Sequence, residues 1–171
     1  MKRLIIVLLL FVLVVSCQEQ RKQRYFAESN ETKTLEAGIA AYESADWDKW
    51  RSHFSDTAKI YVNSKDPVTL DARVEELTGM TAFFSSYGFE KDKSYIEMVI
   101  DKEDETWVYF WGQHNGKMVN GTELSIPVHL AVQFTEGKIT AEHVYFDGTE
   151  MNAAISAMQE ASATETEMAE E

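Results

Sequence analysis

The hydrophobic pattern of this chain changes its period part-way along, and that change limits the folds that the chain can adopt. Up to Ser85, apolar residues recur every three or four positions, which is typical of amphipathic helices. Between Ser94 and Phe146, apolar and polar residues alternate, which is typical of half-buried strands. Helical segments followed by a run of strands predict an α+β domain, in which the helices pack on one face of a curved antiparallel sheet.

The pattern also places the individual elements. Helices are predicted over residues 31–44, over a short segment capped by Asp46, and from Asp71 to a stop at Gly88. A closing helix follows Thr149. The predicted strands cover residues 58–63, 94–100, 106–113, 123–134 and 138–146. The last two strands form a hairpin that turns at Glu136-Gly137.

The N-terminus has the features of an export signal. A basic start precedes an unbroken apolar run from Leu4 to Val15, which is shorter than the roughly 20 residues that span a membrane. The sequence VVSC, ending at Cys17, resembles the lipobox of bacterial lipoproteins. That resemblance implies cleavage before Cys17, lipidation of this residue, and an extracytoplasmic protein anchored to a membrane of the bacterial cell envelope. The alternative is a plain signal peptide that is cleaved elsewhere.

Two polar segments bracket the predicted domain of residues 35–158. Residues 18–34 are expected to form a tether, and residues 159–171 an acidic, disordered tail. Loss of Lys2 and Arg3 with the signal takes the formal net charge from −13 to −15. This charge argues against nucleic acid as a partner, because phosphate binding needs a basic surface. No cysteine follows Cys17, so no disulfide can form within the domain.

Two segments of the domain are similar to SnoaL-like domains of the nuclear transport factor 2-like superfamily. Residues 42–64, YESADWDKWRSHFSDTAKIYVNS, resemble the opening of these domains, and residues 132–155, VQFTEGKITAEHVYFDGTEMNAAI, resemble their close. The resemblance implies a cone, in which a strongly curved sheet wraps around N-terminal helices and leaves a pocket between them. The group contains cyclases, isomerases, hydrolases and non-catalytic binding modules, so the fold alone does not specify an activity.

The last hairpin predicts which side chains face that pocket. A two-residue turn at 136–137 sets a register in which Leu130 faces His143. The apolar inner face then carries three candidate catalytic residues near its open end: His143, Tyr145 and Asp147. The same register points His129 outward. A shift by one residue would exchange the two faces.

Three interpretations of this triplet remain: acid/base catalysis, binding of a ligand without turnover, and a structural role. In SnoaL-like cyclases the acid/base carboxylate lies near the end of the last strand, and Asp147 matches that position. The resemblance therefore implies acid/base chemistry by Asp147. Its partner would be His143 or Tyr145, which the predicted register places on the same face, and a pocket of low polarity would raise the pKa of Asp147. The structural interpretation is an Asx-type turn at Asp147, followed by a helix, with the histidine and the tyrosine packed in the core.

Aromatic residues point to a pocket and to a subunit interface. Strand 106–113 is apolar on both faces, so both faces must be covered. Helices would cover one face, and loops or a second subunit the other. Nuclear transport factor 2-like domains commonly dimerise through the outer face of the sheet, so we expect a homodimer. The residues expected to line the pocket are Trp50, Phe54, Tyr61, Trp107, Tyr109, Trp111, Val128 and Leu130.

These features lead to three functional hypotheses. The first is binding of a small, largely apolar molecule in the cone, without a cofactor. The second is an enzyme of the cyclase, isomerase or hydratase type, and the third a structural or protein-interaction module whose cone is filled. The four histidines show no HxxxH or HxH spacing, so no metal site is predicted.

Overall fold

The computed structural model describes residues 22–169. The predicted signal peptide, Cys17 and the first part of the predicted tether lie outside the described residues. Within residues 22–169, no helix is both long enough and apolar enough to cross a membrane.

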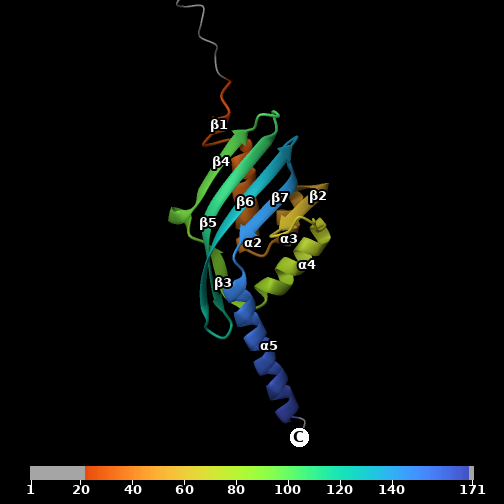
Figure 1. The fold of residues 1–171 in the computed structure, drawn as a ribbon, viewed down its shortest axis with the longest axis vertical. Helices are drawn as coiled ribbons and strands as arrows, with labels where there is room; N and C mark the ends of the chain where they lie inside the picture. Colours follow the sequence, from red (N-terminus) through yellow and green to blue (C-terminus); the bar gives the residue numbers. More distant parts are fainter. Residues whose placement is uncertain (1–21, 170–171) are drawn as a thin grey trace, which may run out of the picture.

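A curved sheet forms the body of the domain (Figure 1), with helices against one of its faces. The strand order is β1-β4-β5-β6-β7-β2, and β3 pairs with β5 beyond the end of β4. Strands β4 to β7 form the predicted antiparallel meander, whereas β2 pairs with β7 in parallel, so the sheet is mixed. The strands are β1 (Tyr25–Phe26), β2 (Phe54–Val62), β3 (Phe84–Phe89), β4 (Tyr95–Ile100), β5 (Thr106–Met118), β6 (Glu123–Thr135) and β7 (Lys138–Phe146).

Side-chain caps set the starts of the helices. The Ser29 hydroxyl accepts a hydrogen bond from the Thr32 amide at the start of α2, and the Asp46 carboxylate accepts one from the Lys49 amide in α3, as the sequence predicted. Thr69 caps the next helix in the same way. The described helices are α2 (Asn30–Glu43), α3 (Trp47–Ser52), α4 (Leu70–Thr81) and α5 (Thr149–Ala169), with a single 3₁₀ turn at Lys91–Lys93.

Strand β1 and the first turn of α2 lie in the segment 18–34 that was expected to form a tether, and two segments within the domain also differ from the sequence prediction. The helix that was expected to reach Gly88 ends at Thr81, and β3 begins at Phe84. Strand β5 continues to Met118, through a segment that resembles a loop because it contains Asn-Gly. Gly116 permits this, since a Cβ atom there would lie 2.5 Å from the ring of Phe84, which packs over the strand. The pairing of β3 with β5 therefore depends on a long-range contact that local periodicity does not report.

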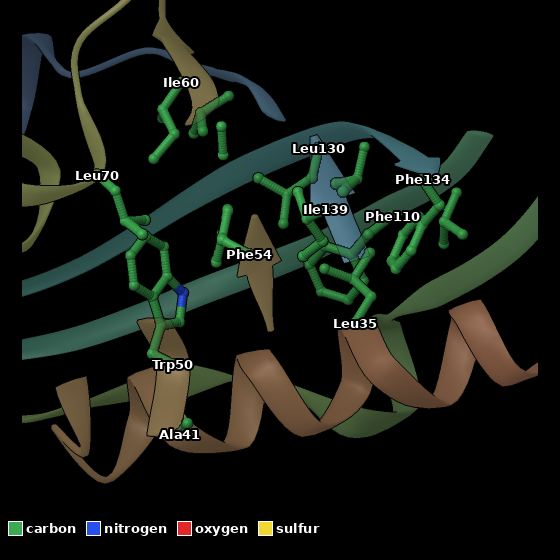
Figure 2. Close-up of a cluster of buried hydrophobic side chains, with 14 of the residues drawn as sticks. Leu35, Ala41, Trp50, Phe54, Ile60, Leu70, Phe110, Leu130, Phe134 and Ile139 are labelled. Atoms are coloured by element: carbon green, nitrogen blue, oxygen red, sulfur yellow. The ribbon is translucent and has the colours of Figure 1, made fainter. Parts of the chain in front are cut away.

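The main core lies between the inner face of the sheet and the helices. Figure 2 shows Leu35 on α2 facing side chains from the sheet, among them Phe110 and Ile139. Ile60, Val108 and Val132 belong to the same core and are fully buried. Burial of each such side chain contributes roughly 1.5–3 kcal/mol to folding, so this layer stabilises the curvature of the sheet against the helices.

A second, smaller core lies at the other end of the sheet. It joins Phe84 and Met118 to Met151 on α5. Helix α5 then projects beyond the sheet (Figure 1) and continues through Ala169, into the segment for which composition predicted a disordered tail. Only the first turns of α5 therefore belong to the packed domain.

Candidate functional site

The face of β7 that points into the cone is decided by a β-bulge. The turn pairs Thr135 with Lys138, as predicted, and Phe134 with Ile139. Thr140 is not paired with any residue of β6, and the register shifts there, so that Val132 pairs with Glu142. The register predicted for the rest of the hairpin is therefore wrong by one residue, and the two faces of β7 are exchanged beyond the bulge.

His143 and Tyr145 consequently lie on the outer face of the sheet, not in the cone. The ring of His143 stacks on Tyr61 of β2, with centroids 4.4 Å apart. Tyr145 is 49% exposed and its ring faces His129, which points outward as predicted. Burial by these neighbours lowers the pKa of His143. The two residues form part of a surface and have no access to the cone.

Asp147 makes the Asx-type turn of the structural interpretation. Its Oδ1 accepts hydrogen bonds from the Thr149 hydroxyl at 2.6 Å and from the Thr149 amide at 3.0 Å. These bonds lower the pKa of Asp147, contrary to the raised value that acid/base chemistry requires. The carboxylate lies at the rim of the cone, where it leads β7 into α5.

The cone contains a cavity of about 550 Å³. Its walls come from α2, α3 and α4 on one side and from the inner face of β5, β6 and β7 on the other, and the first turns of α5 lie at one end. Four predicted pocket residues line it: Trp50, Phe54, Val128 and Leu130. The other four, Tyr61, Trp107, Tyr109 and Trp111, lie on the outer face, where their rings contact His129 or His143, and this part of the pocket prediction is corrected.

Glu142 is the titratable group that the bulge brings into the cavity. It is 5% exposed, and its carboxyl group has no hydrogen-bond partner among the described residues. Burial raises the pKa of this carboxyl group to about 7, although the positive charge of Arg73 opposes the rise. Glu142 is therefore able to hold or release a proton near neutral pH.

Arg73, on α4, lines the same cavity. It is 8% exposed, and its Nη1 donates a hydrogen bond to Oε2 of Glu76, at 2.8 Å, one turn along the helix. Its buried Nε has no partner among the described residues. A guanidinium has five N–H donors, so this ion pair leaves most of the hydrogen-bonding capacity of Arg73 unused.

A tyrosine and a histidine form a second polar feature of the wall. The Oη of Tyr42 on α2 lies 2.9 Å from Nε2 of His114 on β5. Burial lowers the pKa of His114 to about 4, so the imidazole is neutral at physiological pH. Burial also raises the pKa of Tyr42 well above its usual range, so the phenol keeps its proton. The pair offers neutral hydrogen-bonding groups in an apolar surrounding.

Sequence reasoning missed Glu142, Arg73 and His114 for identifiable reasons. The regular hairpin register placed Glu142 on the outer face, and the Asn-Gly segment made His114 look like a solvated loop residue. Arg73 lies in a helix otherwise rich in charged residues, and nothing local distinguishes it from a surface arginine. Within residues 22–169, no group of three or more histidine, cysteine, aspartate or glutamate residues could hold a metal ion.

The sequence matches no protein-family model and no curated protein. The structure does match solved structures. A protein of unknown function from Burkholderia pseudomallei, described as nuclear transport factor 2-like, superposes with a TM-score of 0.58 at 14% identity, over 72% of this chain and 95% of that chain. A protein from Shewanella denitrificans that carries the name SnoaL-like polyketide cyclase also gives 0.58, at 11% identity, over 76% and 99%.

A third match is a protein from Catenulispora acidiphila with a ketosteroid isomerase-like fold, in complex with trimethylamine. Its TM-score is 0.53 at 14% identity, over 66% of this chain and 84% of that chain. Identities this low establish the fold and leave the activity open. The protein therefore has the nuclear transport factor 2-like fold, and the predicted α+β cone is confirmed. The fold is that of the SnoaL-like and ketosteroid isomerase-like structures within this class.

Proposed function

We propose that this protein binds a small, largely apolar molecule inside its cone. The observation that supports the proposal is the open cavity, whose volume of about 550 Å³ falls among those of small-molecule sites, roughly 300–1,000 Å³. A cone filled by its own side chains would instead have favoured a structural module. The few polar groups on the wall, from Tyr42, Arg73, His114 and Glu142, would orient the ligand.

Native mass spectrometry tests this proposal. Residues 18–171 would be exported in the protein's own host, with a non-lipoprotein signal in place of residues 1–17, and purified without detergent. We expect extra mass that is lost on denaturation. The matched control is Val128→Trp, which adds a large side chain to the cavity wall and should remove the extra mass. A bare wild-type mass, together with no binding of an added apolar probe such as decanol, would contradict the proposal.

Acid/base catalysis on the bound molecule is the second candidate. The observation that favours it is the buried carboxyl of Glu142, whose pKa of about 7 suits proton transfer near neutral pH. An enzyme of the cyclase, isomerase or hydratase type would use this group in place of Asp147. Its test is to incubate the released ligand with the wild type and with Glu142→Gln. Conversion by the wild type alone, with binding retained in both, would support catalysis.

We also propose that the protein works at a membrane of the bacterial cell envelope, held by a lipid on Cys17. The supporting features are the basic start, the short apolar run and the VVSC sequence. With a net charge of −15 after cleavage, the chain is repelled by anionic lipid surfaces, so attachment would depend on the anchor.

Homodimerisation through the outer face of the sheet completes the proposal. This face carries a band of stacked rings, here called the outer aromatic band: Tyr61, Trp107, Tyr109, Trp111, His129, His143 and Tyr145. Trp111 and Tyr145 are 42% and 49% exposed. A contiguous exposed aromatic surface is typical of protein interfaces, and a second copy would cover it.

A further inference from the structure

The cavity wall contains a cation with a buried hydrogen-bond donor that has no partner among the described residues. Arg73 is enclosed by protein and uses Nη1 for Glu76, while Nε has no partner among the described residues. Glu76 has a half-exposed side chain, so solvent weakens its hold on the guanidinium. Buried polar groups are nearly always hydrogen-bonded, so an arginine in this state on a cavity wall points to an acceptor that enters the cavity.

Glu142 does not supply that acceptor. The positive charge of Arg73 lowers the pKa of Glu142 and so opposes the effect of burial, which raises it. Yet no ion pair within 4.0 Å and no hydrogen bond joins the two side chains. Both line the same cavity, and each lacks a partner that the other could have provided. The space between them therefore suits an oxygen atom that can accept a hydrogen bond from each.

We propose that the cavity selects apolar carboxylates, with the ligand carboxylate held between the Arg73 guanidinium and the protonated carboxyl group of Glu142. Arg73 donates N–H bonds to the anion, and Glu142 donates an O–H bond. The apolar body of the ligand lies along the walls formed by Leu35, Phe54, Val128 and Leu130. This inference rests on the proposed binding function and names the class of ligand.

The proposal predicts that the affinity for carboxylates depends on pH. The titratable groups around the cavity determine whether the affinity rises or falls with pH. The titratable side chains that line the cavity besides Glu142 are Tyr42 on α2, Arg73 and Glu76 on α4, His114 on β5 and Asp147 after β7. Tyr42 and His114 are neutral across the range near pH 7, because burial moves their pKa values away from it. Ionisation of Glu142 would add a negative charge next to the ligand and weaken its binding.

Isothermal titration calorimetry on residues 18–171 separates the contribution of the ligand's charge to affinity from that of its apolar body. The probes are decanoate, 2-naphthoate and decanol. Decanol keeps the apolar body of decanoate and loses the charge, whereas 2-naphthoate keeps the charge on a fused-ring body. We expect at least one carboxylate to bind about 10- to 100-fold more tightly than decanol, in line with one or two charged hydrogen bonds. Which carboxylate binds more tightly tells whether the site favours a chain or a ring.

Three variants test the roles of the residues. Arg73→Met keeps the aliphatic stem and should lower carboxylate affinity by about 10- to 100-fold, with little change for decanol. Glu76→Gln removes the competing carboxylate from a half-exposed position and should raise carboxylate affinity, so the proposal does not depend on a variant that could fail to fold. Glu142→Gln should abolish the loss of affinity that we expect for the wild type between pH 6 and pH 8, on either side of the pKa of about 7.

The outcomes separate this inference from the binding function itself. Equal affinity for decanoate, 2-naphthoate and decanol would overturn the carboxylate inference and leave the apolar binding function standing. Unchanged carboxylate affinity in Arg73→Met, or a fall in carboxylate affinity in Glu76→Gln, would overturn the carboxylate inference in the same way. Absence of binding by all three probes would overturn both.

Discussion

Val132 and Glu142 face each other across the β6–β7 hairpin, and both side chains point into the cone. This pairing exists because Thr140 is an unpaired bulge residue two positions before Glu142. Without the bulge, Ala141 would face Val132, and Glu142 would lie among the rings of the outer face. One extra residue thus decides which titratable group the cavity contains.

The first prediction concerns the free energy of unfolding of Glu142→Gln. Burial raises the pKa of Glu142 from 4.5 to about 7, so the folded protein binds this proton more tightly than the unfolded chain does. The contribution of Glu142 to wild-type stability therefore falls as pH rises from 4.5 to 7. Relative to wild type, the variant should gain up to about 3 kcal/mol over this window, measured by urea unfolding at several pH values. Glu123→Gln, at an exposed position, is the control and should follow the wild-type profile.

For His114, the pH dependence of the free energy of unfolding should have the opposite sign, and His114→Gln tests this. Burial lowers the pKa of His114 from 6.5 to about 4, so the unfolded chain takes up this proton first and wild-type stability falls as pH drops through that range. The variant should lack this loss, which amounts to as much as about 3 kcal/mol at the acid end. The Glu142 and His114 effects have opposite signs over this range, so each is measured as the difference in free energy of unfolding between variant and wild type at the same pH. Profiles of variant and wild type that ran parallel would count against a buried, neutral His114.

Trp111→Arg should weaken the proposed homodimer. A charge at the centre of the outer aromatic band would have to be desolvated in the interface, so the dissociation constant should rise at least about tenfold. Sedimentation velocity over a concentration series measures it. Val119→Arg is the matched control, because Val119 is 60% exposed and lies in the turn between β5 and β6, outside the band. A wild type that stays monomeric at micromolar concentration would contradict the dimer.

Cys17→Ser should release the protein from the membrane. The side chain that would carry the lipid is lost, and within residues 22–169 no helix is long and apolar enough to cross a membrane. Cell fractionation and metabolic labelling with a fatty acid report the outcome. Unchanged attachment and unchanged labelling in the variant would show that the anchor lies elsewhere.

Some features of the site were accessible from the sequence. The hairpin turn at Glu136-Gly137, with φ values of 52° and 77°, was predicted from its length and from Gly137, which tolerates positive φ. The outward position of His129 and the inward positions of Trp50 and Phe54 agree with the hydrophobic pattern. In each case the element is short, or begins at a recognisable turn or cap, so local chemistry determines the geometry.

By itself, the sequence determined the order of most helices and strands, the hairpin turn and the α+β class, because period and turn chemistry are local properties. The tertiary structure alone decided which side chains of β7 line the cone. Strand β7 pairs with β6 on one edge and with β2 on the other, and the registers of both pairs shift near Thr140. An alternation with a period of two does not carry across such a shift. Glu142 rather than His143 therefore lies in the cone because β7 bulges at Thr140, where its register shifts against both neighbouring strands.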